Sequence, residues 1–97
     1  MREIIATDVF LEWIRRLRDH QARARLFAKI DRLQYGNPGD LKRVAKGIAE
    51  LRLHYGPGYR VYVTLHESRV VLLCGGDKSS QRADIEVARR IAMQARN

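Results

Sequence analysis

The chain has little cysteine and proline and no long apolar segment. Its 97 residues include one cysteine, Cys74, and two prolines. No apolar run approaches the ~20 residues that a membrane-spanning helix needs. A lone cysteine cannot form an internal disulfide, and its apolar neighbours indicate a buried, inert thiol. Because the sequence also starts without a charged-then-apolar leader, we expect a cytoplasmic protein with no membrane partner.

Charge is the most unusual property of the composition. Lysine and arginine number 19 against 11 aspartates and glutamates, so the formal net charge is +8, while 45% of the residues are apolar. This length and apolar fraction predict one small globular domain over residues 1–97, with room for a single core. A basic surface of this size favours a polyanion such as nucleic acid, an anionic membrane or an acidic protein.

Hydrophobic periodicity predicts a strand, two helices, three strands and a last helix. Helical spacing of Phe10, Ile14 and Leu17 indicates the first helix, and Gly36-Asn37-Pro38-Gly39-Asp40 ends the second. The remaining segments are an edge strand at 2–6, the second helix at 21–35, a basic connector around 42–46, a hairpin at 48–65, a buried strand at 70–74 and a helix at 81–95. This order, β-αα-βββ-α, predicts an α+β fold: a mostly antiparallel sheet with an N-terminal helical hairpin and a C-terminal helix.

The hairpin is the most informative segment for function. Apolar and polar residues alternate on both sides of a turn at Gly56-Pro57-Gly58, and side chains two apart share a strand face. The apolar face is expected to carry Leu51, Leu53, Val61, Val63 and Leu65. The opposite face is expected to carry Glu50, Arg52, His54, Arg60 and Tyr62. That second face combines the groups that bind a phosphodiester and move protons around it.

These residue types suit RNA cleavage without a metal or another cofactor. Arginines bind two phosphate oxygens at once, so Arg52 and Arg60, with Lys78, are candidates for stabilising the transition-state charge. Glu50 is the candidate base that removes the 2′-hydroxyl proton, and His54 is a possible acid. A cross-strand salt bridge is the alternative role for Glu50. The sequence has no Cys/His or carboxylate spacing typical of a metal site.

Further cations and tyrosines extend the predicted RNA-binding surface. Lys42, Arg43 and Lys46 stand in the basic connector before the hairpin. Tyr59 and Tyr62 lie in the hairpin, where their rings are candidates for stacking on unpaired bases.

Three motifs resemble those of the RelE/ParE toxin superfamily, and more narrowly its HigB-like "addiction module killer protein" branch. They are Gly47-Ile48-Ala49-Glu50-Leu51-Arg52, Gly58-Tyr59-Arg60-Val61-Tyr62 and the stretch from Leu72 to Gln81. The resemblance covers nearly the whole chain. It implies the toxin of a type II toxin–antitoxin system that acts as a ribosome-dependent messenger RNA endoribonuclease, an mRNA interferase that inhibits translation.

The resemblance also implies roles for individual residues. Arg60 matches the arginine of the family's Tyr-Arg strand, Arg52 matches a basic residue of the preceding strand, and Lys78 falls near a basic residue after the last strand. Some ribonuclease members carry Tyr or His a few residues later, where this chain has Gln81-Arg82-Ala83-Asp84-Ile85. That departure shifts any acid–base role to Glu50, His54 or a tyrosine.

The implied partners are a cognate antitoxin, of the helix-turn-helix type in this branch, and the ribosome with its messenger RNA. Promoter DNA would be bound only through the toxin–antitoxin complex. Two alternatives remain open from the sequence. One is a ParE-like inhibitor of DNA gyrase with the same fold, and the other is a nucleic-acid-binding module without catalysis.

Overall fold

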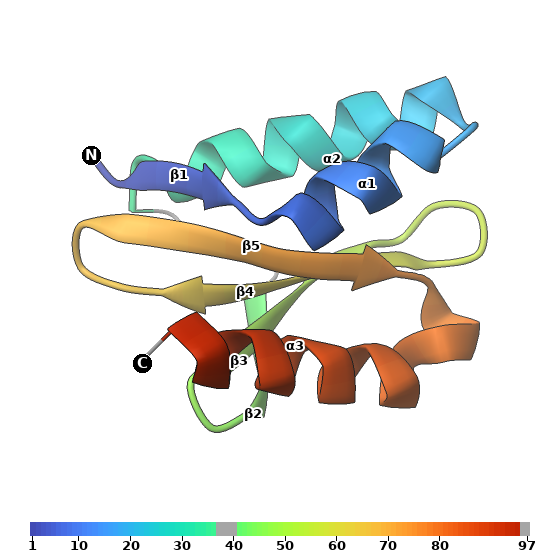
Figure 1. The fold of residues 1–97 in the computed structure, drawn as a ribbon. Coiled ribbons are helices and arrows are strands. Elements are labelled where there is room, and N and C mark those ends of the chain that lie inside the picture. Colours follow the sequence, from blue (N-terminus) through green and yellow to red (C-terminus); the bar gives the residue numbers. More distant parts are fainter. Residues whose placement is uncertain (37–40, 96–97) are drawn as a thin grey trace.

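The computed structural model describes residues 1–36 and 41–95 of the chain (Figure 1). The elements are β1 (Glu3–Ala6), α1 (Asp8–Arg16), α2 (His20–Leu33), β2 (Leu41–Ala45), β3 (Ile48–Leu53), β4 (Tyr59–Leu65), β5 (Arg69–Gly76), the short 3₁₀ helix η1 (Lys78–Ser80) and α3 (Gln81–Ala95). No helix in these two ranges is both long and apolar enough to cross a membrane.

The strands form one five-stranded sheet in the order β1-β5-β4-β3-β2. Strand β1 lies at one edge and pairs in parallel with β5, whereas all other pairs are antiparallel. Helices α1 and α2 cover one face of the sheet, and α3 runs across the other (Figure 1). The predicted α+β class, with a mostly antiparallel sheet, is therefore confirmed.

One prediction about the elements is wrong. Residues 42–46 were expected to form a connector, but Leu41–Ala45 is a strand that pairs with β3 at the second edge of the sheet. The turn between them uses Gly47, whose φ of 74° is easily adopted only by glycine. Adjacent Lys42 and Arg43 conceal the strand in the sequence, yet charged side chains are typical of edge strands because they discourage pairing with other chains. The predicted break at 36–40 falls mainly on residues 37–40, which lie outside the described part.

Helices on both faces give the sheet two apolar layers. The larger layer lies under α1 and α2 and includes Phe10, Leu26, Leu51 and Val63. The smaller layer lies under α3 and consists of Ile48, Tyr62, Leu73, Cys74 and Ala88, with partly buried neighbours. The face expected to be polar and open is therefore partly closed by α3. Leu65, predicted to be in the core, is instead 39% exposed at the end of β4.

Close approach of α3 to the sheet depends on glycine at the end of β5. A Cβ atom added at Gly76 would overlap the Asp84 carboxylate and lie 2.8 Å from Ser80 Oγ. Asp84 and Ser80 are themselves joined by a hydrogen bond of 2.5 Å, which Ser80 Oγ donates. The start of α3 therefore sits directly against the strand, without room for a side chain between them.

Replacing Gly76 with alanine is expected to lower the free energy of unfolding by about 1–3 kcal/mol, the usual cost of overpacking. Urea denaturation followed by circular dichroism measures this change. Arg82→Ala, at an exposed position of α3, serves as the control and should stay within about 0.5 kcal/mol of wild type. An unchanged unfolding midpoint for Gly76→Ala would show that this contact is not tight.

Candidate functional site

Strand pairing brings the main candidate residues onto one face. Glu50 on β3 lies opposite Tyr62 on β4, and Arg52 lies opposite Arg60. Because alternate residues share a face, these four side chains all lie on the α3 side of the sheet. The shared face that the sequence predicts for them is confirmed.

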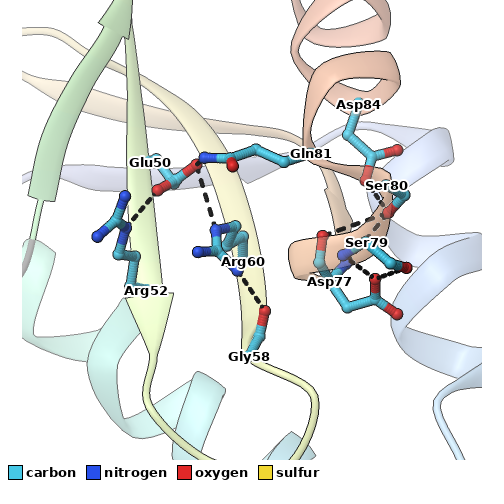
Figure 2. A network of polar contacts seen from close by, with 9 residues as sticks. All are labelled: Glu50, Arg52, Gly58, Arg60, Asp77, Ser79, Ser80, Gln81 and Asp84. Carbon is cyan, nitrogen blue, oxygen red and sulfur yellow. Dashed lines mark hydrogen bonds and ion pairs between the residues drawn. The ribbon is translucent and has the colours of Figure 1, made fainter.

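Glu50 is the centre of the polar network in Figure 2, with its side chain fully buried. Its Oε1 accepts a hydrogen bond of 2.5 Å from Arg52 Nε. Its Oε2 accepts a hydrogen bond of 2.7 Å from Gln81 Nε2 and lies 3.4 Å from Arg60 Nε. Both carboxylate oxygens are therefore engaged with neighbouring side chains.

Arg60 is held from two sides. Beyond its ion pair with Glu50, its Nη1 donates a hydrogen bond of 2.7 Å to the carbonyl oxygen of Gly58. Gly58 has a φ of 77°, and a Cβ atom at that position would lie 3.2 Å from Arg60 Nη1. The turn glycine thus provides both the backbone conformation and the space that the guanidinium needs. The Arg60 side chain is 9% exposed, whereas the Arg52 side chain is 30% exposed.

The electrostatics of the site favour a charged carboxylate. Burial raises the pKa of Glu50, but the hydrogen bonds from Arg52 and Gln81, with the positive charges of Arg52 and Arg60, outweigh burial and leave the pKa below its ordinary value. Glu50 is therefore ionised at neutral pH. Two guanidiniums around one carboxylate leave this part of the site with an excess positive charge, as an anion-binding surface requires.

Lys78 and Lys42 lie at the borders of this network. The backbone N–H of Lys78 donates a hydrogen bond of 3.4 Å to the Pro57 carbonyl, so η1 is attached to the hairpin turn beside Arg60. Lys42 lies opposite Glu50 on β2 and so shares its face. Both lysines are exposed. They extend the positive charge of the arginine pair outward.

The other predicted residues lie apart from the network. Arg43 pairs with Ala49 and so faces the α1/α2 side, while Lys46 is in the β2–β3 turn and lines a groove beside the far end of α3 with Arg89. His54 is exposed just after β3, and within residues 1–36 and 41–95 it has no hydrogen bond or ion pair to the network.

The two tyrosines do not offer free ring faces on the arginine side. Tyr62 is fully buried beneath α3, and its hydroxyl has no hydrogen-bond partner among the described residues. Burial raises the pKa of Tyr62 well above its ordinary value, and the charges of Glu50 and Asp84 raise it further. Tyr59 lies on the opposite face, edge-on to Trp13 with ring centroids 6.4 Å apart. The geometry therefore does not favour base stacking by either ring.

Gln81 is the member of the network to which no role was assigned from the sequence. It is the first residue of α3, directly after η1, whose N-terminal capping box joins Asp77 and Ser80. Gln81 belongs to the segment 81–85, where some ribonuclease members have Tyr or His and this chain does not. It lies 31 residues from Glu50 in the sequence, so no local pattern predicts their contact. Only the packing of α3 on the sheet brings the two side chains together.

Comparison with known proteins gives a family, a relative and a structural neighbour. The family model described as "Phage derived protein Gp49-like (DUF891)" matches residues 12–95. An uncharacterized protein of Haemophilus influenzae (strain Rd) is 46% identical over 93 residues, which cover 95% of this chain and 94% of that protein. A mutant of the Escherichia coli toxin RelE in the free state superposes with a TM-score of 0.74 over 93% of this chain and 97% of that one. At 17% identity, this likeness shows the fold alone.

Acid should weaken the fold through Glu50. A carboxyl whose folded-state pKa lies below its ordinary value of 4.5 contributes stability that is complete above that value and is lost as the pH falls through the folded-state pKa. We expect Glu50→Gln to be about 3–5 kcal/mol less stable than wild type at pH 7, because buried Arg60 loses its counter-charge. The difference should shrink as the pH falls below this ordinary value of 4.5.

Urea denaturation at a series of pH values checks this expectation. Glu86→Gln is the matched control, since the ion pair of Glu86 with Arg89 is exposed. Asp77, whose pKa is also lowered, mainly by a hydrogen bond from Ser79, is present in every variant. If the free energies of unfolding of wild type and Glu50→Gln differed by the same amount down to pH 3, the stabilising role of ionised Glu50 would be contradicted.

Proposed function

Because the chain belongs to the phage-derived Gp49-like family within the RelE superfamily and has the fold of RelE, we propose that it is the toxin of a type II toxin–antitoxin pair. We propose further that it cleaves messenger RNA on the ribosome, without a metal, and so inhibits translation. Its motifs favour the HigB-like branch of the superfamily.

The observation that supports this proposal best is the paired guanidiniums of Arg52 and Arg60 around one buried carboxylate. Such a pair is suited to two oxygens of a single phosphate, because each guanidinium presents donors in a fixed plane. Exposed Lys78 beside the hairpin turn adds a third cation at the rim. A nearly buried Arg60 would act in a region of low dielectric, where a charge is worth more than in water.

The reaction would be a transesterification within RNA. The 2′-oxygen attacks the adjacent phosphorus and loses its proton while the bond from phosphorus to the 5′-oxygen breaks and that oxygen gains a proton. The products are a 2′,3′-cyclic phosphate and a free 5′-hydroxyl. Arg52, Arg60 and Lys78 would stabilise the extra negative charge on the phosphorane oxygens. The roles of Glu50 as base and His54 as acid stay predictions from the sequence.

The proposed partners follow from the same assignment. A cognate antitoxin would neutralise the protein by covering the basic face or by keeping it from the ribosome. An acidic antitoxin segment would be attracted to this surface, since complementary charge accelerates association. Lys42 extends the positive surface along the strand face and is the proposed outer contact for the RNA backbone.

Arg60 provides the first test. Brief induction of the wild type in bacteria should produce new messenger RNA ends inside translated codons, and Arg60→Lys should reduce them on the order of 100-fold. Lysine keeps the charge, so the fold is expected to survive while the planar fork is lost.

Arg89→Ala, which removes an exposed arginine near the far end of α3, is the control and should cleave like wild type. Circular dichroism confirms the fold of each variant. A folded Arg60→Lys that cleaves normally would contradict the role of Arg60. Growth arrest with intact messages and damaged or relaxed DNA would favour a gyrase inhibitor.

Salt provides the second test. If three cations contact phosphates of a single-stranded message, the logarithm of the association constant should fall with the logarithm of salt concentration with a slope of about −2. Fluorescence anisotropy with a labelled RNA oligonucleotide, and sedimentation with ribosomes, measure this slope. Arg52→Ala should reduce its magnitude by about 0.7. A flat dependence would indicate a protein target.

A further inference from the structure

We propose that Glu50 and Gln81 are a positioning pair, which orients the guanidiniums of Arg52 and Arg60 toward a phosphate, and that Glu50 is not the general base. This inference rests on the proposed function, because it concerns the same phosphate-binding arginines. The sequence alone suggests Glu50 as the general base and gives no role to Gln81, so this inference changes the role of Glu50 and adds Gln81 to the site.

The first argument is the way in which the carboxylate contacts the arginines. Glu50 lies against Nε of both guanidiniums, the guanidinium nitrogen nearest the backbone. Arg52 Nε donates a hydrogen bond of 2.5 Å, whereas Arg60 Nε forms an ion pair at 3.4 Å and has no hydrogen-bond partner among the described residues. A guanidinium has five N–H donors, and four of them are on the two Nη atoms. In the described part of the chain, the Nη atoms of Arg52 have no hydrogen-bond partner. The carboxylate thus binds Arg52 at Nε. The Nη donors, which are best suited to phosphate, stay available for a ligand.

The second argument is that Glu50 is poorly arranged to accept a proton. A general base needs a lone pair within reach of the substrate and a pKa near the working pH. Glu50 is fully buried, both of its oxygens are engaged, and its pKa lies below the ordinary value. The same three properties suit a fixed counter-charge, which must stay ionised and must not move.

The third argument concerns Gln81, which links the carboxylate to α3. Figure 2 shows Gln81 reaching from the start of α3 across to Glu50, beside Arg60. Its amide nitrogen donates the 2.7 Å bond to Oε2, the same oxygen that faces Arg60. Because the amide is neutral, Gln81 satisfies this oxygen without adding a charge that would repel an arginine or attract the substrate phosphate.

The position of Gln81 is itself fixed by its surroundings. Asp77 accepts hydrogen bonds from the backbone and the hydroxyl of Ser79, and Ser80 Oγ donates to Asp84 one turn into α3. The Lys78 backbone is bonded to the hairpin turn at Pro57. Hydrogen bonds therefore connect the hairpin turn, η1 and the first turn of α3. Through its hydrogen bond, Gln81 fixes Glu50 relative to these elements.

The test uses the full chain with two variants, Gln81→Ala and Glu50→Gln. Gln94→Ala is the matched control, because Gln94 is an exposed glutamine near the other end of the same helix. Three quantities are measured: the NMR signals of the arginine Nε–H groups, the affinity for an RNA oligonucleotide with a 2′-deoxy group at the cleaved position, and the single-turnover cleavage rate across pH.

For Gln81→Ala we expect a folded protein in which the Nε–H signals of Arg52 and Arg60 shift or broaden, with cleavage reduced by up to about 100-fold. For Glu50→Gln, measured under conditions where circular dichroism shows that it is folded, we expect RNA affinity and cleavage to fall together, while the acidic limb of the pH–rate profile remains. Gln94→Ala should match wild type in all three measurements.

Two results would overturn the positioning role. One is a folded Gln81→Ala with unchanged arginine signals and a normal cleavage rate. The other is a Glu50→Gln that binds RNA normally but loses the acidic limb, as expected for a general base. If wild type itself cleaves nothing on the ribosome, the proposed ribonuclease function fails, and the arginine signals with the RNA affinity still show whether Glu50 and Gln81 orient the two arginines.

Discussion

A single buried carboxylate, Glu50, is the group on which this arrangement depends. A charge removed from water is costly unless it is paired and hydrogen-bonded, and here two guanidiniums and one amide supply those partners. They come from β3, β4 and α3, so the need to satisfy one side chain ties three elements together. The same need places two positive charges next to each other, where their mutual repulsion is offset by the carboxylate between them.

Helix α3 has a double effect on the sheet. Along most of its length it buries an apolar layer, and this layer encloses Tyr62 although charged Glu50 lies opposite it on β3. At its N-terminal end the helix instead contributes a polar residue, Gln81, to the charged network (Figure 2). The face is therefore divided into a dry part and a charged part, and only the charged part is suited to an anionic ligand.

The basic side chains are distributed unevenly between the charged part of this face and the rest of the molecule. Arg52, Lys42 and Lys78 border the buried network, whereas Arg43 faces the other side of the sheet and Lys46 lies beside the far end of α3. The family and the fold are the basis on which we propose a basic toxin. We propose that such a protein acts through the surface where β3, β4 and the start of α3 meet, because the paired arginines lie there.

Local patterns in the sequence determine much of this molecule, because they depend on neighbouring residues alone. Alternation around Gly56-Pro57-Gly58 predicts the hairpin and the shared face of Glu50, Arg52 and Arg60, and helical spacing predicts the three long helices. Tertiary packing decided the rest. Strand β2 is recognised only by its pairing with β3, Tyr62 is buried only because α3 covers it, and Gln81 meets Glu50 across 31 residues. Periodicity shows which side chains share a face, but burial and partners depend on what packs against that face.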